Sequence, residues 1–367
     1  MCRYRPFLIL FALFLLLTGC NNPSVQSESS AEEVSQEPKI EYEIIQSPYP
    51  HLSNNARNVW DMRIFEGSLY IGAGDYDLNV SPSAAYRYDL ADEKWYTCGA
   101  IPDEQIHRFC IIDGELYIPG CDPTGDWSLG NFYKLEDKNF VTHRVIPQGI
   151  HCFDLVGHEN KLFAALGYTS ESTEFPVAVS EDGGKSFKNV KHSGGSKSDV
   201  RVYKLFSHGG ELYALNGVEI YRYDGEKFIF EASWKSGFVA GYPYYTRIGE
   251  SAYFKGRTYF TTGYLFHFED VKNLQYTIFE NAIVTDLAVY GDKLYVLCAK
   301  PLENGNYLIC LTVTEDGKSF ETVKTVEYGL PALSFELDGT TLYLGIGDIS
   351  TADDARKGEI LKTEVPE

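Results

Sequence analysis

The sequence predicts an all-β fold built from repeated units, and three observations support this prediction. Aromatic residues are abundant, with 27 Tyr and 22 Phe against 2 Met, a composition that favours β-sheets. A short phrase recurs along the chain at the length of a four-stranded repeat. No long stretch has the 3.6-residue period of an amphipathic helix. Together these features predict a seven-bladed β-propeller with four antiparallel strands in each blade.

The recurring phrase is a strand, a turn with Gly or Asp, and then an apolar residue before an aromatic one, as in residues 64–70 and 112–117. The aromatic markers are Tyr70, Tyr117, Phe163, Tyr213, Tyr259, Tyr295 and Tyr343. Their intervals of 47, 46, 50, 46, 36 and 48 residues define seven units, one of them short. Most units have a second polar turn ahead of another aromatic, such as Asp224 before Phe228, which predicts a second hairpin.

The two ends of the chain predict how the ring closes. Only 24 residues follow Tyr343, enough for a third strand at 358–365 but not for a fourth. Residues 40–45 alternate between polar and apolar side chains and have no partner nearby in the sequence. We therefore expect this N-terminal strand to complete the last blade and to cover its open edge.

The N-terminus has the features of a lipoprotein signal. Arg3 and Arg5 precede an apolar run at 7–17 that is too short to span a bilayer. The next residues, Leu17-Thr18-Gly19-Cys20, resemble the lipobox of bacterial lipoproteins, in which the Cys is lipidated. An ordinary secretory signal with an incidental Cys is the alternative. The resemblance implies a protein held outside the cytoplasm by a lipid anchor on the bacterial cell membrane.

Three segments follow from these patterns: the signal peptide at 1–19, the lipidated Cys20 with a disordered tether at 20–38, and the propeller at 39–367. The tether is rich in Ser, Glu and Gln. It cannot bury enough apolar surface to offset the loss of chain entropy on folding.

Net charge limits the partners. The chain has 32 Lys and Arg against 52 Asp and Glu, a formal charge of −20, and without residues 1–19 the charge is −22. Such a surface repels the phosphates of nucleic acids and of anionic lipids. We therefore expect no nucleic-acid partner and membrane attachment only through the lipid on Cys20. We also expect a monomer.

Two turns carry a family resemblance. Residues 180–187, SEDGGKSF, resemble the Asp-box of sialidase-like propellers, and residues 314–320 form a version one residue short. Residues 86–89 with Trp95 are similar to a kelch repeat. In such families the Asp-box is a turn remote from the active centre. The resemblance therefore implies structural roles for Asp182 and Asp316, whose carboxylates would cap backbone amides.

The loops that join second to third strands differ in length among the blades. They are long at 73–83, 120–131, 167–175, 300–306 and 347–357, but short at 216–217 and 263. Long loops around one face of a propeller favour recognition. The predicted ligand site has Trp127 as its anchor and Asp122, Asp126, Arg108 and His107 as polar partners. The alternative, that Trp127 only caps its own loop, stays open.

A ring of mostly charged residues is predicted at the channel. The residues nine positions before the markers, near the start of each innermost strand, are Asp61, Arg108, Asp154, Lys204, Glu250, Asp286 and Ser334. Charges crowded around an axis need partners, which favours ion pairs that fix neighbouring blades. A ligand site at the channel mouth is the alternative.

Metal signals are weak. Asp75, Asp77 and Asn79 alternate as at the start of a calcium loop, but Val80 stands where Gly is needed. His107 and His151, on neighbouring inner strands, lack a third ligand. The propeller segment has six Cys without a metal spacing, of which Cys298 and Cys310 flank a predicted hairpin. We expect no cofactor and no metal site.

These observations favour a non-catalytic binding or scaffolding module for a glycan, a peptide or a partner protein, and no catalytic residue is assigned. The alternative is a sialidase-like glycoside hydrolase, which would need three arginines to grip a carboxylate. Arg63, Arg108, Arg201 and Arg247 are sufficient in number. An enzyme should bring at least two arginines and a pair of carboxylates into one pocket.

Overall fold

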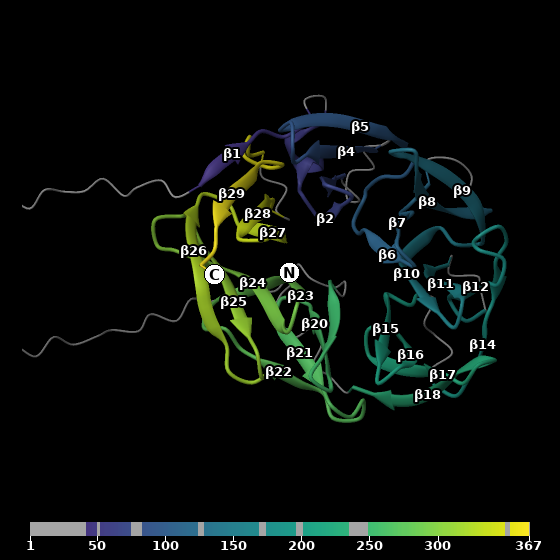
Figure 1. Cartoon of the computed structure of the whole chain (residues 1–367). Helices are drawn as coiled ribbons and strands as arrows, with labels where there is room; N and C mark the ends of the chain where they lie inside the picture. The colour runs from purple at the N-terminus through teal and green to yellow at the C-terminus, as the bar shows by residue number, and fades with distance from the viewer. Residues whose placement is uncertain are drawn as a thin grey trace, which may run out of the picture. The chain divides into compact units, whose positions relative to one another are not determined.

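Seven β-sheets follow one another around a ring in the computed structural model, which describes residues 42–49, 52–74, 83–123, 128–168, 174–195, 201–234, 249–348 and 353–366 (Figure 1). Each sheet is a blade whose first strand lines the central channel. The ring belongs to the compact unit Glu41–Glu367. This confirms the predicted seven-bladed β-propeller.

The strands of the blades are as follows. Blade 1 has β2 (Asp61–Phe65), β3 (Ser68–Gly72), β4 (Ser83–Asp89) and β5 (Lys94–Ile101). Blade 2 has β6 (Cys110–Ile112), β7 (Glu115–Pro119), β8 (Leu129–Glu136) and β9 (Asn139–Pro147). Blade 3 has β10 (His151–His158), β11 (Lys161–Gly167), β12 (Val177–Ser180) and β13 (Lys188–Asn189). Blade 4 has β15 (Lys204–His208), β16 (Glu211–Leu215), β17 (Glu219–Tyr223) and β18 (Lys227–Ser233).

Blade 5, the short unit, has β19 (Ser251–Phe254), β20 (Arg257–Thr261), β21 (Leu265–Phe268) and β22 (Gln275–Thr277). Blade 6 has β23 (Ile283–Tyr290), β24 (Lys293–Pro301), β25 (Tyr307–Thr314) and β26 (Glu321–Tyr328). Blade 7 has β27 (Ala332–Asp338), β28 (Thr341–Ile346), β29 (Ile360–Glu364) and β1 (Glu43–Ile45). The described residues contain a single helix, the 3-10 turn η1 (Asn54–Arg57). No helix in these ranges is long and apolar enough to cross a membrane.

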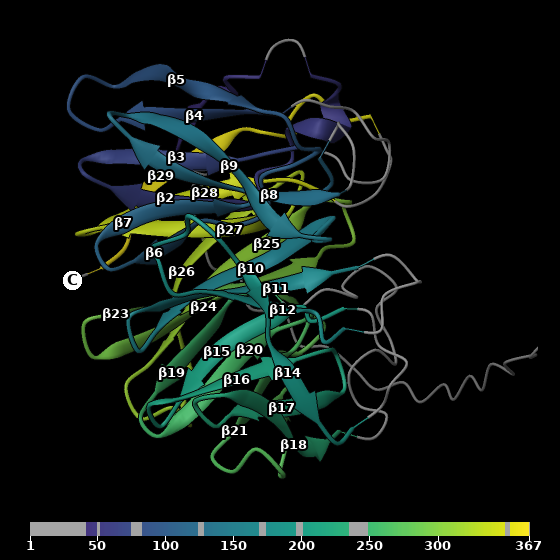
Figure 2. The same ribbon diagram turned by 90° about the vertical axis from the view of Figure 1, so that its right-hand side faces the viewer.

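The ring has two faces, between which the strands run (Figure 2). We call the side with the turns between first and second strands the hairpin face, and the opposite side the loop face. Every aromatic marker is the third residue of its blade's second strand. The turn before it often has positive φ at both central residues, as at Glu66 (φ 46°) and Gly67 (φ 73°). That turn type matches the twist of a two-residue hairpin.

The N-terminal strand completes blade 7, as predicted. Ile44 of β1 pairs with Leu361 of β29, and Ile45 pairs with Ile360, in an antiparallel ladder. Successive side chains point to opposite sides of the sheet. Ile45 is therefore 6% exposed and packs in the core, whereas Ile44 is 40% exposed.

In the described part of the ring, the apolar core is divided into seven clusters, one between each pair of consecutive blades. The cluster at the closing seam joins Ile45 and Tyr343 of blade 7 to Met62 and Leu69 of blade 1. The seam therefore buries apolar side chains in the same way as the interfaces inside the ring.

Backbone hydrogen bonds repeat at the interfaces as well. An amide near the start of a blade's inner strand donates to a carbonyl at or just after the end of the previous blade's second strand. Examples are Ile106 N to Ala73 O at 2.8 Å and Cys152 N to Gly120 O at 2.7 Å. The closing seam has the same bond, from Val59 N to Ile346 O at 3.4 Å.

One strand departs from the four-strand prediction. After β13 the chain crosses to the next blade, where β14 (Lys191–Ser193) pairs in parallel with the outer strand β18. Blade 4 therefore has five strands. The residues of β14 give no periodic signal, because a three-residue strand is too short to show one.

The six cysteines among the described residues are free thiols, all buried except the half-buried Cys310. Cys298 and Cys310 lie directly opposite each other on β24 and β25, as their positions beside the hairpin predicted.

Candidate functional site

Three aspartates at the start of inner strands join neighbouring blades through backbone amides. Asp286 Oδ1 accepts a hydrogen bond from Leu287 N of its own strand at 2.7 Å, and Oδ2 accepts one from Phe335 N of blade 7 at 2.9 Å. Asp61 and Asp154 make the equivalent pairs of bonds, reaching Phe109 N at 2.6 Å and Leu205 N at 3.1 Å in the next blades.

The local backbone explains how these side chains are aimed. The ladders of blades 3, 6 and 7 skip one residue immediately before Asp154, Asp286 and Ser334. Such β-bulges redirect the side chain that follows them. Ser334 takes the corresponding place at the closing seam, where its Oγ donates to Val59 O at 3.0 Å.

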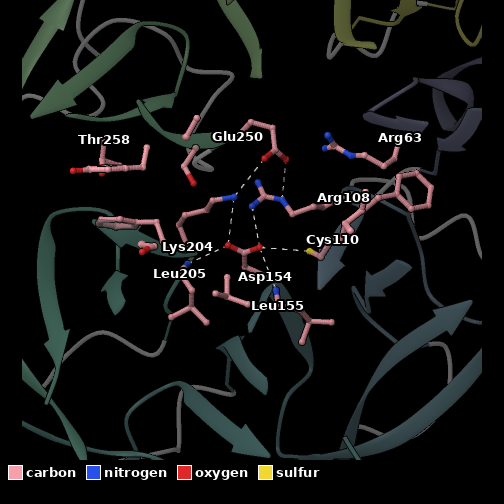
Figure 3. A pocket seen from close by; sticks show the side chains of 17 residues that line it. Arg63, Arg108, Cys110, Asp154, Leu155, Lys204, Leu205, Glu250 and Thr258 are labelled. Carbon is pink, nitrogen blue, oxygen red and sulfur yellow. Dashed lines mark hydrogen bonds and ion pairs between the residues drawn. The ribbon is translucent and has the colours of Figure 1, made fainter. Parts of the chain in front are cut away.

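Four side chains from blades 2 to 5 form a closed ring of ion pairs across the channel (Figure 3). Arg108 lies 3.1 Å from Asp154 and 3.3 Å from Glu250. Lys204 lies 3.4 Å from Asp154 and 3.7 Å from Glu250. Two positive and two negative charges therefore alternate around the ring. We call these four residues the charge quartet.

Arg108 spans the channel. Blades 2 and 5 are not neighbours in the ring, yet Arg108 also donates from Nη2 to the carbonyl of Gly249 at 2.6 Å. Asp154 has 3% of its side chain exposed, and Arg108 and Lys204 each have 5%. Burial raises the pKa of Asp154 to about 6, although Arg108 acts in the opposite direction. Because each charge has partners of opposite sign, the quartet offsets much of its own desolvation.

A second ionic group ties blade 7 to blade 1. Arg63 lies 3.0 Å from Glu336 and 3.7 Å from Asp61. The amide of Ile64 donates to the other oxygen of Glu336 at 3.0 Å. Burial raises the pKa of Glu336 to about 7, against the attraction of Arg63. The ion pairs that the sequence favoured between blades are therefore present in both groups.

A cavity of about 420 Å³ lies in the channel beside the quartet. Its walls come from the inner strands of blades 2 to 5, and Arg63 of blade 1 reaches it. Ile111, Ser207 and Tyr253, near the hairpin ends of these strands, are exposed at its rim. The cavity therefore opens toward the hairpin face, with the quartet as its floor.

No protein-family profile and no curated protein matches the chain. Among solved structures, it is similar to virginiamycin B lyase from Staphylococcus aureus, with 10% identity and a TM-score of 0.55 over 88% of this chain and 98% of that one. The Pan2 WD40 domain of Neurospora crassa is 11% identical, with a TM-score of 0.55 over 88% and 94%.

A third similar structure is the extracellular domain of a protein assigned as a hybrid two component system from B. thetaiotaomicron, with 10% identity and a TM-score of 0.55 over 89% of this chain and 42% of that one. Identities this low show the fold alone. The fold is a β-propeller. It occurs in these structures in an enzyme, in a WD40 domain and in an extracellular domain.

The structure separates the residues of the predicted ligand site. Arg108 belongs to the quartet and lines the cavity. Asp122 lies at the junction of blades 2 and 3, 3.1 Å from Nδ1 of His151, and His107 Nε2 lies 3.0 Å from Phe153 O. Neither Asp122 nor His107 lines the cavity. The anchor Trp127 and its neighbour Asp126 lie outside the described residues.

The other assigned residues fall in two groups. Cys20 and the calcium candidates Asp75, Asp77 and Asn79 lie outside the described residues. Asp182 and Asp316 occupy turns between third and fourth strands on blades 3 and 6. Among the described residues, no group of three or more His, Cys, Asp and Glu side chains is placed to hold a metal ion.

In each of the two Asp-box-like turns, the aspartate accepts hydrogen bonds from backbone amides and from a serine hydroxyl of its own turn. Asp182 accepts hydrogen bonds from Ser186 N at 3.0 Å and from Ser186 Oγ at 2.6 Å. The bonds from Ser186 lower the pKa of Asp182 to about 2. Asp316 accepts from Lys318 N at 2.7 Å and from Ser319 N at 2.8 Å. The turns lie at the hairpin ends of outer strands, away from the channel.

Arg63, Glu336 and Tyr253 also lie along the channel, but the repeating phrase does not mark them. Arg63 and Glu336 stand two positions after Asp61 and Ser334 of the predicted ring. Residues two apart on a strand share a face, so the period of two was a usable signal. Tyr253 had no such signal beyond its place at the end of an inner strand.

Proposed function

We propose that this chain is a lipid-anchored, extracytoplasmic binding module that holds part of a glycan, a peptide or a partner protein in its central cavity. The observation that carries the proposal is the cavity of about 420 Å³ above the charge quartet. Its volume falls in the range of small-molecule sites, about 300–1,000 Å³. Apolar walls with a few convergent polar groups are typical of such sites.

The ion pairing of the charged groups in the cavity favours binding over hydrolysis. Arg63 and Arg108 share the cavity with Asp154 and Glu250, so the arginine and carboxylate pairs expected of an enzyme are together. Both arginines, however, are already ion-paired with carboxylates of this chain. A sialidase-like mechanism needs arginines that are available to a substrate carboxylate. We therefore propose a non-catalytic role.

The location is proposed from the N-terminal sequence. The signal at 1–19, the lipidated Cys20 and the tether at 20–38 would hold the propeller outside the cytoplasm. The acidic surface leaves the lipid as the means of attachment.

The loop face is a second candidate surface. The contact between Asp122 and His151 lies at the junction of blades 2 and 3 on that side, with the Asp122 side chain 24% exposed. Asp122 belongs to the site predicted around Trp127.

One experiment separates the two faces. Ser207 is exposed at the cavity rim, so Ser207→Trp should fill the mouth and abolish ligand capture while the melting temperature stays within a few degrees. Trp127→Ala should leave capture unchanged. Binding is measured by pull-down from surface extracts and confirmed with the purified ligand. The reverse pattern, with capture lost only in Trp127→Ala, would assign the function to the loop face.

A further inference from the structure

Resting on the proposed function of the cavity, we infer that its ligand is a neutral, polyhydroxylated group, the terminal sugar of an uncharged glycan. Three features of the cavity support this ligand: its charge balance, the two charged groups that remain partly accessible, and the side chains at the rim.

Charge balance disfavours an ionic ligand. Within the quartet, Arg108 and Lys204 balance Asp154 and Glu250. Arg63, the remaining charged residue of the lining, is held by Glu336 at 3.0 Å. An added ion would be an uncompensated charge among buried groups, which is costly. A neutral ligand leaves the balance intact.

Carboxylates behind the lining make an anion the least favourable ligand. Asp61 lies on the channel-lining strand β2 and accepts hydrogen bonds from two backbone amides. Its negative charge, together with those of Asp154 and Glu250 in the lining, would repel an acidic sugar, so the site differs from one built to grip a carboxylate. A cation, in turn, would approach the three positive side chains of the lining.

The accessible polar groups suit hydroxyls. Glu250 has 22% of its side chain exposed and Arg63 has 23%, one acceptor and one donor group. Sugar hydroxyls both donate and accept, so a sugar can use both groups without disturbing the ion pairs. Ser207 and Ser251 add hydroxyls to the lining.

The rim supplies an aromatic surface. Tyr253 is 48% exposed and Ile111 is 49% exposed, and both line the cavity. The C–H face of a sugar ring can pack on an exposed tyrosine ring while its hydroxyls reach the polar floor. A ligand with one apolar face and several hydroxyls therefore matches both the aromatic rim and the polar floor of the cavity.

The test screens purified protein on an array of neutral, acidic and amino oligosaccharides, with calorimetry on the best binder and on a set of tripeptides. Neutral glycans should bind best. Tyr253→Ala should weaken binding about tenfold or more, as expected of an aromatic anchor. The matched control is Tyr276→Ala, because Tyr276 on β22 of the same blade is 59% exposed but does not line the cavity. It should stay within twofold.

A second variant tests the charge argument. Glu250→Gln removes one negative charge from the cavity, so acidic oligosaccharides should gain affinity relative to neutral ones. Circular dichroism and melting curves check that each variant is folded. The result with Tyr253→Ala stands on its own if Glu250→Gln does not fold.

The inference is wrong if acidic or amino sugars bind more tightly than neutral ones to the unmodified protein, or if both tyrosine variants lose binding equally. Tripeptides that bind best and depend on Tyr253 would overturn the ligand class but leave the binding function standing. If no probe depends on Tyr253 or is blocked by Ser207→Trp, the proposed function of the cavity fails with it.

Discussion

Asp286 bridges two neighbouring blades, because its carboxylate accepts a hydrogen bond from one backbone amide of each. Among the described residues, it does so without a direct ion pair to a side chain. It binds Leu287 N and Phe335 N, and it is 6% exposed. Burial, together with the nearby Glu250 and Asp61, raises the pKa of Asp286 well above its usual range. The channel tolerates this carboxylate because two amides satisfy its oxygens.

Asp286→Ala should therefore destabilise the propeller. Two buried amides would lose their acceptor, at about 1–3 kcal/mol each, so unfolding in urea should show a loss of about 2–6 kcal/mol. Asp286→Asn keeps one acceptor oxygen and should lose less. Asp292→Ala, at an exposed turn of the same blade, is the control and should change stability by less than about 0.5 kcal/mol. Equal losses in the two alanine variants would show that the bridge contributes nothing.

At the scale of elements, closure of the ring depends on a strand of three residues. β1 is short, but Ile45 enters the core cluster between blades 7 and 1 while its neighbour Ile44 faces outward. The register of β1 on β29 decides which of the two is buried, because a shift of one residue would exchange them.

Ile45→Ala should therefore cost about 2 kcal/mol or more, as for other buried aliphatic residues, whereas Ile44→Ala should cost less than about 0.5 kcal/mol. Thermal and urea unfolding of the two variants measure the difference. Similar values for both would mean that this strand is not docked in the observed register. A larger loss of stability for Ile44→Ala would indicate that β1 pairs with β29 one residue out of the observed register.

At the scale of the whole molecule, the apolar core is spread over seven equivalent interfaces around a channel, so no single blade contains the core of the fold. The channel is also where the symmetry of the repeat ends. Charged residues on blades 2 to 5 meet across the axis, and Arg63 of blade 1 pairs with Glu336 of blade 7. The cavity follows from this asymmetry, because identical blades would place identical side chains around the axis.

The proposed location of the whole molecule depends on one residue at its N-terminus. Cys20→Ser should move the protein from the membrane fraction to the soluble or secreted fraction, because no other segment of this acidic chain is expected to hold a bilayer. Cys2→Ser is the matched control and should remain with the membrane. Fractionation with immunoblotting measures both. Membrane retention of the Cys20 variant would contradict the anchor.

The sequence alone determined the number of blades, because a marker recurs at each second strand and the apolar pattern of a strand is local. It also determined the closing strand. It placed Asp61, Arg108 and Glu250 at equivalent positions of the ring, because each lies nine residues before the aromatic marker of its blade. Only the tertiary structure decided that Arg108 reaches across to blade 5 and that the cavity opens toward the hairpin face. Those facts depend on contacts between residues more than a hundred positions apart, such as Arg108 and Gly249, and no local pattern records which partners meet at an axis.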